Sequence, residues 1–246
     1  MLFREILMPV LVSAVVLITM AYLTYAERRI LGSMQFRHGP NRVGPAGLLQ
    51  PIADAIKLIF KQHMTPKNAN GYLFIFAPIF AFFISMIVWA FIPVGISGAY
   101  ILNELSLLWI MMISACHVYG LLLAGWASNS KYALLGALRA SAQVLSYELA
   151  LSLIFLTLVI LSGSLDLNQI TLLQQSPERM CIEWNGVKYP PLLVLYCICI
   201  IAETHRAPFD IAEGESELVA GYHVEYGSWG FALFFLAEYI QMIVAS

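Results

Sequence analysis

The chain has 246 residues, of which 60% are apolar and only 11% are charged. Such a composition excludes an ordinary soluble domain and predicts an integral membrane protein with little room for a separate soluble domain. The net charge of −2 gives no reason to expect a nucleic-acid partner. The N-terminal residues run directly into an apolar segment, without the pattern of a cleavable signal or an Arg- and Ser-rich transit peptide.

Six apolar segments are predicted to cross the membrane, since about 30 Å of hydrocarbon must be spanned at about 1.5 Å per residue. They lie near residues 6–26, 72–94, 105–126, 142–161, 190–206 and 218–246. The fifth is too short unless it continues through Glu203 toward Arg206. Glu148 lies within the fourth segment and Glu238 within the sixth. The predicted fold is therefore all-α: a polytopic helix bundle that forms one transmembrane domain over residues 1–246.

A different helix is predicted between the first two spans, over residues 48–61. Apolar side chains recur there at spacings of four and three, at Leu48, Ile52, Ile56 and Ile59. Polar side chains such as Asp54 and Lys57 occupy the opposite face, and Pro51 suits a first turn. The pattern predicts an amphipathic helix lying at the membrane interface, although an ordinary surface helix has the same periodicity.

The segment from Glu203 to Glu225 concentrates acidic residues beside apolar spans. Its acidic members are Glu203, Asp210, Glu213, Glu215, Glu217 and Glu225, and its one arginine is Arg206. Hydrocarbon and neighbouring carboxylates both disfavour the charged form of a carboxylate, which is the condition that a proton relay needs. If residues 213–217 are extended, their three glutamates face one way, whereas in a helix Glu215 points away from the other two. A solvated acidic loop is the alternative interpretation.

The distribution of Lys and Arg predicts the orientation. Ten of them lie in the loops after spans one, three and five, and three lie on the other side. The richer side is expected to be the cytoplasmic or matrix side, so the N-terminus is expected outside. The basic loop after the first span and the acidic segment then lie on the same inner side of the membrane.

Cysteines and isolated polar residues give weaker signals. The cysteines Cys116, Cys181, Cys197 and Cys199 form no CxxC pair and have no histidines at ligand spacing, so no metal, iron–sulfur cluster or disulfide framework is expected. His117, in the third span, is expected to be a packed, hydrogen-bonded core histidine rather than a member of a relay. Glu27 beside Arg28, like Lys131 and Arg139, could serve only to anchor a helix end at the interface.

Long motifs occur in three separate segments, residues 26–61, 124–148 and 202–239. They include FRHGPNRVGPAGLLQPIAD, AGWASNSKYALLGALR and ETHRAPFDIAEGESELVAGY. In these motifs the chain resembles the quinone-chamber membrane subunit of respiratory complex I, subunit 1 of NADH:quinone oxidoreductase, over essentially its whole length. The family usually reads PFDLPEAEAELVAGY in the last motif. Here the spacers at positions 211, 212, 214 and 216 differ, and the acidic positions are kept.

The resemblance implies eight transmembrane helices, of which about six lie in this chain and two more follow residue 246. It implies a quinone cavity at Glu27, Arg28, Asp54, Arg206 and Asp210. It also implies a proton path through Glu148, Glu203, Glu213, Glu215, Glu217 and Glu238. His205 is given no role, because the family commonly varies at that position.

The same resemblance implies that no cofactor is bound by this chain alone. Quinone would be the substrate, and electrons would come from FMN and iron–sulfur clusters on partner subunits. The expected partners are the peripheral-arm quinone-site and iron–sulfur subunits, adjacent membrane subunits and lipids, but no nucleic acid. The mitochondrial inner membrane is the expected location, and the bacterial plasma membrane is the alternative.

Two other functions remain open at this point. A related membrane subunit of a membrane-bound hydrogenase complex would share the fold and the acidic residues without binding quinone, and the full GPNRVGPAGLLQPIAD segment argues against it. A secondary transporter is the third candidate. Transporters often contain inverted repeats with paired broken helices, and the sequence has no visible repeat.

Overall fold

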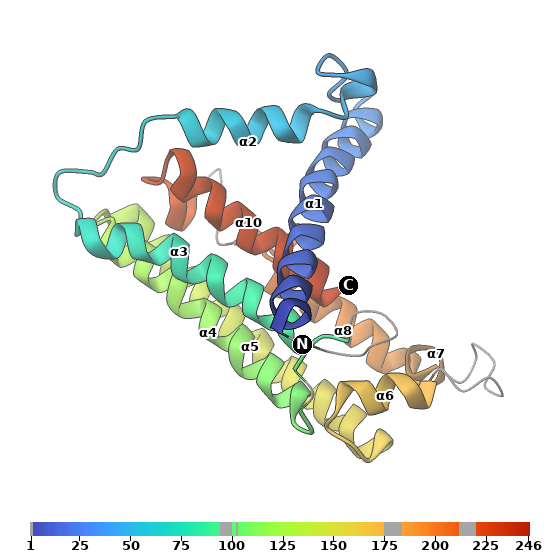
Figure 1. Ribbon diagram of the computed structural model, residues 1–246. Helices are drawn as coiled ribbons and strands as arrows, with labels where there is room; N and C mark the ends of the chain where they lie inside the picture. Colours follow the sequence, from blue (N-terminus) through green and yellow to red (C-terminus); the bar gives the residue numbers. More distant parts are fainter. Residues whose placement is uncertain (1, 94–99, 102, 175–183, 212–219) are drawn as a thin grey trace.

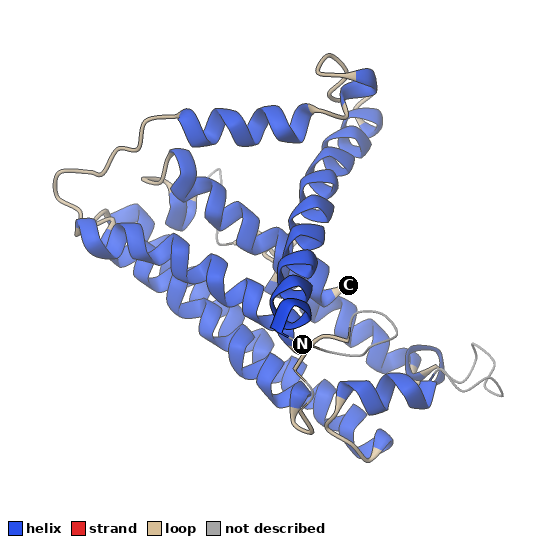
Figure 2. Ribbon diagram, viewed as in Figure 1, coloured by secondary structure: helices blue, strands red, loops and turns tan. Residues whose placement is uncertain are grey.

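The computed structural model describes residues 2–93, 100–101, 103–174, 184–211 and 220–246. Every regular element in these ranges is a helix, as Figure 2 shows. Within them, five stretches are long and apolar enough to cross a membrane: Pro9–Met34, Gly71–Ala90, Ser106–Ala127, Lys131–Ser162 and Ser228–Ala245. The predicted all-α membrane bundle is therefore confirmed.

The first four predicted spans correspond to long helices. They are α1 (Leu2–Met34), α3 (Gly71–Ile87, continued by the 3-10 turn η2, Val88–Ala90), α4 (Ser106–Ala127) and α5 (Lys131–Ser162). The helix α5 begins eleven residues before the predicted span at 142, because Ser130 caps its first turn by accepting a hydrogen bond from the Ala133 amide at 3.2 Å. It ends at Gly163, whose φ of 72° is a left-handed C-terminal cap.

The last two predicted spans are shorter in the structure. The helix α8 (Pro190–Glu203) has 14 residues and ends before Arg206, so the predicted helix through 206 is wrong at its C-terminal end. The helix α10 (Ser228–Ala245) begins ten residues after the predicted start at 218. A separate 3-10 turn, η4 (Gly221–His223), precedes it, and Gly221 has a φ of 59° that a continuous helix would not allow.

The helices α3, α4 and α5 lie side by side, with α10 against α3 and α8 against α5 (Figure 1). Small residues permit this close packing. An added Cβ at Gly120 would lie 2.9 Å from the Ala81 side chain, and one at Gly125 would overlap the Ala137 side chain. Membrane helices commonly approach one another through such small residues.

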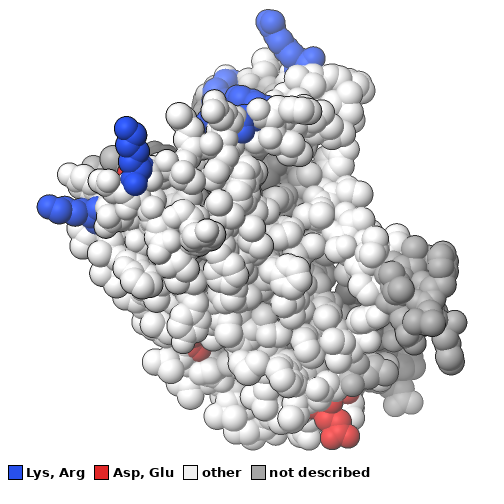
Figure 3. Space-filling model, turned by 60° about the vertical axis from the view of Figure 1, so that its left-hand side comes forward, with Lys and Arg blue, Asp and Glu red and all other residues white. Residues whose placement is uncertain are grey.

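The helix α1 packs on α10 and extends past it to a loop that leads into α2 (Gln50–Phe60; Figure 1). A helix is present over the predicted amphipathic segment, with Pro51 in its first turn, and its position at the membrane interface stays a prediction. None of its residues is buried, and Ile52, Ile56 and Ile59 of its apolar face are at least half exposed. Figure 3 shows Lys and Arg side chains gathered toward the end of the molecule that holds α2 and the C-terminal end of α1.

Short helices complete the described fold. The turn η1 (Pro45–Gly47) precedes α2, and α6 (Leu167–Gln174) and α7 (Asn185–Lys188) lie between α5 and α8. The amide of Leu167 donates to the Ser106 hydroxyl at 2.9 Å, which holds the start of α6 against the start of α4.

Candidate functional site

A charged cluster lies where α1, α10 and the turn after α8 meet. Arg206 Nη1 lies 2.6 Å from Glu27 Oε1, and the Tyr239 hydroxyl donates to Glu27 Oε2 at 2.5 Å. The Arg206 guanidinium also lies over the Tyr239 ring, 4.9 Å from its centroid. The side chains of Arg206 and Glu27 are 34% and 30% exposed. The cluster is therefore only partly screened by solvent, and the Glu27 carboxylate receives two strong, charge-assisted hydrogen bonds.

Next to this cluster, Glu238 accepts a hydrogen bond from the Tyr222 hydroxyl at 2.5 Å. Tyr222 belongs to η4 and is 1% exposed, with its ring packed edge-on against Phe234. The approach of η4 to α5 depends on Gly136, because an added Cβ there would lie 2.7 Å from the Gly221 backbone. The close approach of Gly136 and Gly221 thus positions Tyr222, whose hydroxyl donates to the Glu238 carboxylate.

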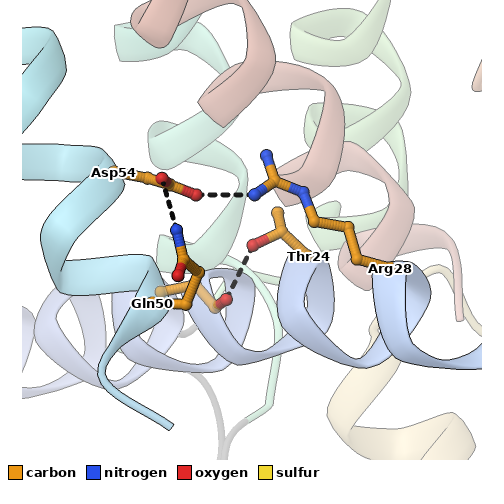
Figure 4. Close-up of polar contacts among 5 residues, drawn as sticks. Thr24, Arg28, Gln50 and Asp54 are labelled. Atoms are coloured by element: carbon orange, nitrogen blue, oxygen red, sulfur yellow. Dashed lines mark hydrogen bonds and ion pairs between the residues drawn. The ribbon is translucent and has the colours of Figure 1, made fainter. Parts of the chain in front are cut away.

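A second ion pair connects α1 to α2 (Figure 4). Arg28 Nη1 lies 2.6 Å from Asp54 Oδ2, and Gln50 donates to Asp54 Oδ1 at 3.0 Å. Thr24, one turn before Arg28, bonds to its own helix backbone at the Ala21 carbonyl (2.7 Å). The Arg28 side chain is 58% exposed, so this pair contributes far less to stability than a buried pair would.

The loop between α1 and α2 is fixed by a separate set of bonds. The Tyr25 hydroxyl donates to the Ala46 carbonyl at 2.5 Å, and Arg29 donates to the Tyr25 hydroxyl at 2.7 Å. Gly39 packs on the α1 backbone, since an added Cβ would lie 2.9 Å from Arg29 Cα. These contacts give the loop a bent, ordered path between α1 and α2.

Glu148 of α5 and Glu203 of α8 both line a cavity of about 540 Å³. Its wall is mainly apolar, and the two carboxylates lie within electrostatic range of each other. Glu148 Oε1 is buried and has no hydrogen-bond partner among the described residues. Two carboxylates that face one apolar space are suited to share or exchange a proton, because like charges in such a space disfavour double ionisation.

The turn after α8 is held by Gln143 of α5. Its amide nitrogen donates to the carbonyls of Ala202 and Phe209, both at 2.7 Å. These bonds fix the two ends of the segment that contains Glu203 and Arg206, and Asp210 follows directly with a partly buried side chain. The predicted proton-path residues Glu213, Glu215 and Glu217 lie outside the described residues, so the question of an extended or helical acidic segment stays open.

The structure therefore brings together most of the predicted site residues in pairs. Glu27 meets Arg206, Arg28 meets Asp54, and Glu148 shares a cavity with Glu203. Three further residues of these contacts, Tyr222, Tyr239 and Gln143, were not predicted from the sequence. A signal for the tyrosines existed, because a tyrosine buried in an apolar helix usually needs a partner for its hydroxyl, and Tyr239 directly follows Glu238. In the described ranges, no three His, Cys, Asp or Glu side chains are grouped as a metal site.

Comparison with known proteins decides the family. Residues 7–246 match the family model described as NADH dehydrogenase. The chain belongs to this family. It is 50% identical over 253 residues to proteins named as a subunit of NADH-quinone oxidoreductase from Rickettsia bellii (strain RML369-C), Rickettsia rickettsii (strain Iowa) and Rickettsia felis (strain ATCC VR-1525 / URRWXCal2). Each match covers 100% of this chain and 74% of the relative.

These relatives correct one expectation. They are bacterial proteins, so the mitochondrial inner membrane named from the sequence is not supported, and a bacterial plasma membrane fits better. The resemblance stated from the three sequence segments is confirmed, because the family match extends over nearly the whole chain.

Proposed function

We propose that this chain is a membrane subunit of NADH:quinone oxidoreductase that forms part of the quinone cavity and links quinone reduction to proton translocation. The observation that carries the proposal is that the Arg28–Asp54 and Glu27–Arg206 pairs join α1 to α2 and to the turn after α8, while the Tyr239 hydroxyl bond to Glu27 adds α10. The name shared by the relatives supports the assignment to the complex. Membership of the family also favours this function over that of a secondary transporter.

The quinone would bind beside these two ion pairs. Quinone carbonyls only accept hydrogen bonds, and the two arginines keep further N–H donors after pairing with Glu27 and Asp54, because a guanidinium has five. The exposed apolar side chains of α2, such as Ile52 and Ile56, suit the apolar remainder of a quinone. An apolar site with a few convergent polar groups is the common form of a small-molecule site.

Quinone reduction would be coupled to proton uptake through electrostatic repulsion. A reduced, negatively charged quinone near Asp210 and the following glutamates increases their affinity for protons by like-charge repulsion. The Glu148–Glu203 cavity and Glu238, held by Tyr222, offer carboxylates for onward transfer. Electrons would come from an iron–sulfur cluster on a partner subunit, and FMN would lie on a partner as well, so this chain would supply the pocket and the proton path.

Partner subunits would cover the surfaces that this chain leaves exposed. Phe36, in the loop after α1, is 100% exposed and Met34 is 70% exposed. Apolar residues exposed beside a basic surface are typical of an interaction site. We propose that the loops at residues 28–71 and 203–217 lie against soluble redox subunits, with other membrane subunits and lipids around the helices, in a bacterial plasma membrane.

The test is purification of the assembly through a tag on this chain. Co-purification with flavin and iron–sulfur subunits, together with inhibitor-sensitive reduction of a quinone by NADH, is the expected result. Photo-crosslinking with an azido-quinone should label residues on α1, α2 or α10. A complex that oxidises hydrogen and reduces no quinone would favour the hydrogenase alternative, and a stable monomer without redox partners would contradict the proposal.

A further inference from the structure

Near its C-terminal end, α10 supplies an amide side chain, that of Gln241, to the wall of the Glu148–Glu203 cavity. Gln241 follows Glu238 by three residues, and residues at this spacing are neighbours on a helix surface. Glu238 itself accepts the hydrogen bond of the Tyr222 hydroxyl. Of the α10 residues that line the cavity, Gln241 is therefore the one nearest to Glu238 in the sequence.

The end of α10 that carries Gln241 is bonded to α8. The Tyr196 hydroxyl of α8 donates to the Ala245 carbonyl at 3.1 Å. Tyr196, Ile200 and Glu203 all line the cavity, and their spacings of four and three put them on one side of α8. The bond therefore holds α10, one turn after Gln241, beside the helix that carries Glu203.

The hydroxyl groups of the cavity wall have already used their protons. Ser85, Ser114 and Ser152 donate to carbonyls of their own helices at 2.9, 2.9 and 2.7 Å, and Tyr196 donates to Ala245. The amide of Gln241 carries two N–H donors. Within the part of the chain that the structure describes, this amide forms no hydrogen bond to another residue. Its donors are therefore left for the interior of the cavity.

The two carboxyl groups of the cavity need such a donor. Glu148 Oε1 is buried and has no hydrogen-bond partner among the described residues. An ionised carboxylate beside apolar groups is costly unless it is hydrogen-bonded. The cavity of about 540 Å³ has room for ordered water, and a buried water usually makes about three hydrogen bonds. Glu148, Glu203 and Gln241 can supply these three partners.

We propose that Gln241 is a positioning residue that holds water between the Glu148 and Glu203 carboxyl groups and so lets a proton pass from one to the other. Its amide donates to the water, and the water donates to the carboxylate. As a proton moves from the protonated carboxyl group to the water, the water gives one of its own protons to the other carboxylate. The amide keeps its hydrogens throughout. This inference rests on the proposed function of the chain.

The experiment compares Gln241→Met with Gln241→Asn in the assembled complex in its membrane. Met has an unbranched side chain of similar length without N–H groups, whereas Asn keeps the amide on a shorter stem. Gln241→Met should lower the kcat of quinone reduction roughly 10-fold, the size expected when a hydrogen bond to a charged group is lost. The KM for quinone should stay unchanged, because the proposed quinone site lies at the two ion pairs of α1. Gln241→Asn should keep most of the kcat, since a water can fill the space of the lost methylene.

The matched control is Met242→Leu. Met242 is the next residue of α10 and packs in the cluster around Val16 and Met20 of α1, outside the cavity wall. Its kcat should equal that of the unmodified complex, since exchanges between Leu and Met conserve volume.

A normal kcat in Gln241→Met would overturn the proposal, and so would an Asn variant as slow as the Met variant. Failure of Gln241→Met to assemble, or a raised KM together with a lower unfolding temperature, would assign Gln241 a structural role instead. If the unmodified complex reduced no quinone, the proposed function itself would fail.

Discussion

Glu27 and Arg206 are 179 residues apart in the sequence, yet their side chains meet at 2.6 Å and join α1 to the end of α8. The Tyr239 hydroxyl binds the second oxygen of the same carboxylate and adds α10 to the junction. Three elements that enclose the proposed quinone cavity therefore share one polar contact. Its disruption should affect both the stability of the bundle and the geometry of the site.

Replacement of Arg206 by Gln should destabilise the assembled protein by about 1.5–3 kcal/mol, the usual range for a hydrogen bond to a charged group. The Glu27 carboxylate would stay partly buried with Tyr239 as its remaining described partner. Thermal unfolding of the purified complex and the KM for quinone measure the effect, and KM should rise. Lys188→Gln, at an exposed position of α7 outside both proposed contact loops, is the control. An unchanged KM and unfolding temperature would contradict a role for the pair.

The Arg28–Asp54 pair should behave differently. Because Arg28 is 58% exposed, we expect Arg28→Gln to change stability by less than about 1 kcal/mol. The pair nevertheless sets the position of α2 beside α1, so the KM for quinone should rise more than the unfolding temperature falls. Salt should weaken the effect, since exposed ion pairs are screened. A large loss of stability with an unchanged KM would show that the pair is structural.

The cavity carboxylates give a third prediction. Glu148→Gln and Glu203→Gln keep the side-chain volume and remove the titratable group, so assembly should persist while protons translocated per electron or turnover falls. The double variant should be little worse than either single variant, because the two groups act on one proton path. Glu104→Gln, at an exposed carboxylate, should have no effect. Normal pumping in both single variants would assign these residues a structural role.

The sequence predicted the helices well where apolar runs are long. It failed at the ends of α8 and α10, because hydropathy cannot detect a turn held by tertiary bonds. The polar residue Gln143, within α5, bonds to the carbonyls of Ala202 and Phe209 and fixes the turn that ends α8. In the same way, the Gly136–Gly221 contact that places η4 before α10 depends on two segments meeting in space.

The site was partly predictable for a related reason. The resemblance to the family, applied to charged positions of an apolar chain, pointed to Glu27, Asp54 and Arg206 as cavity residues and to Glu148 as a residue of the proton path. Their pairing could not be read from spacing, because Glu27 and Arg206 meet only after α1 and α8 have packed. Tyr222 could be recognised from the sequence only as a residue whose hydroxyl would need a partner if buried, and the fold shows that this partner is Glu238.

Gly136→Ala should destabilise the protein by about 1–3 kcal/mol, the usual cost of overpacking. The new Cβ would lie 2.7 Å from the Gly221 backbone and would move Tyr222 away from Glu238. The thermal unfolding temperature and the quinone-dependent turnover should both fall. Gly71→Ala is the matched control, because nothing lies within 4 Å of its added Cβ at the start of α3. Equal stability of the two variants would contradict this account of the α5–η4 contact.

The stability of the protein should fall between pH 6.5 and pH 4 partly because of His223, which lies in η4 outside the long apolar helices. Burial lowers the pKa of His223 from 6.5 to about 4, and the ring packs against Phe231 and Phe235. In this range the unfolded chain binds a proton that the folded protein excludes, so stability is lost as the pH falls.

At about 1.4 kcal/mol per pKa unit, the contribution of His223 is roughly 3 kcal/mol across that window. His223→Asn removes the titration, so the unfolding temperature of the variant should decline less steeply from pH 6.5 to pH 4 than that of the unmodified protein. Each protein is compared with its own unfolding temperature at pH 7.5. Packing lost in the variant lowers its unfolding temperature equally at all pH values, so only the slope of the profile reports the titration. Parallel pH profiles for the two proteins would show that the folded state accommodates a charged imidazole at this position.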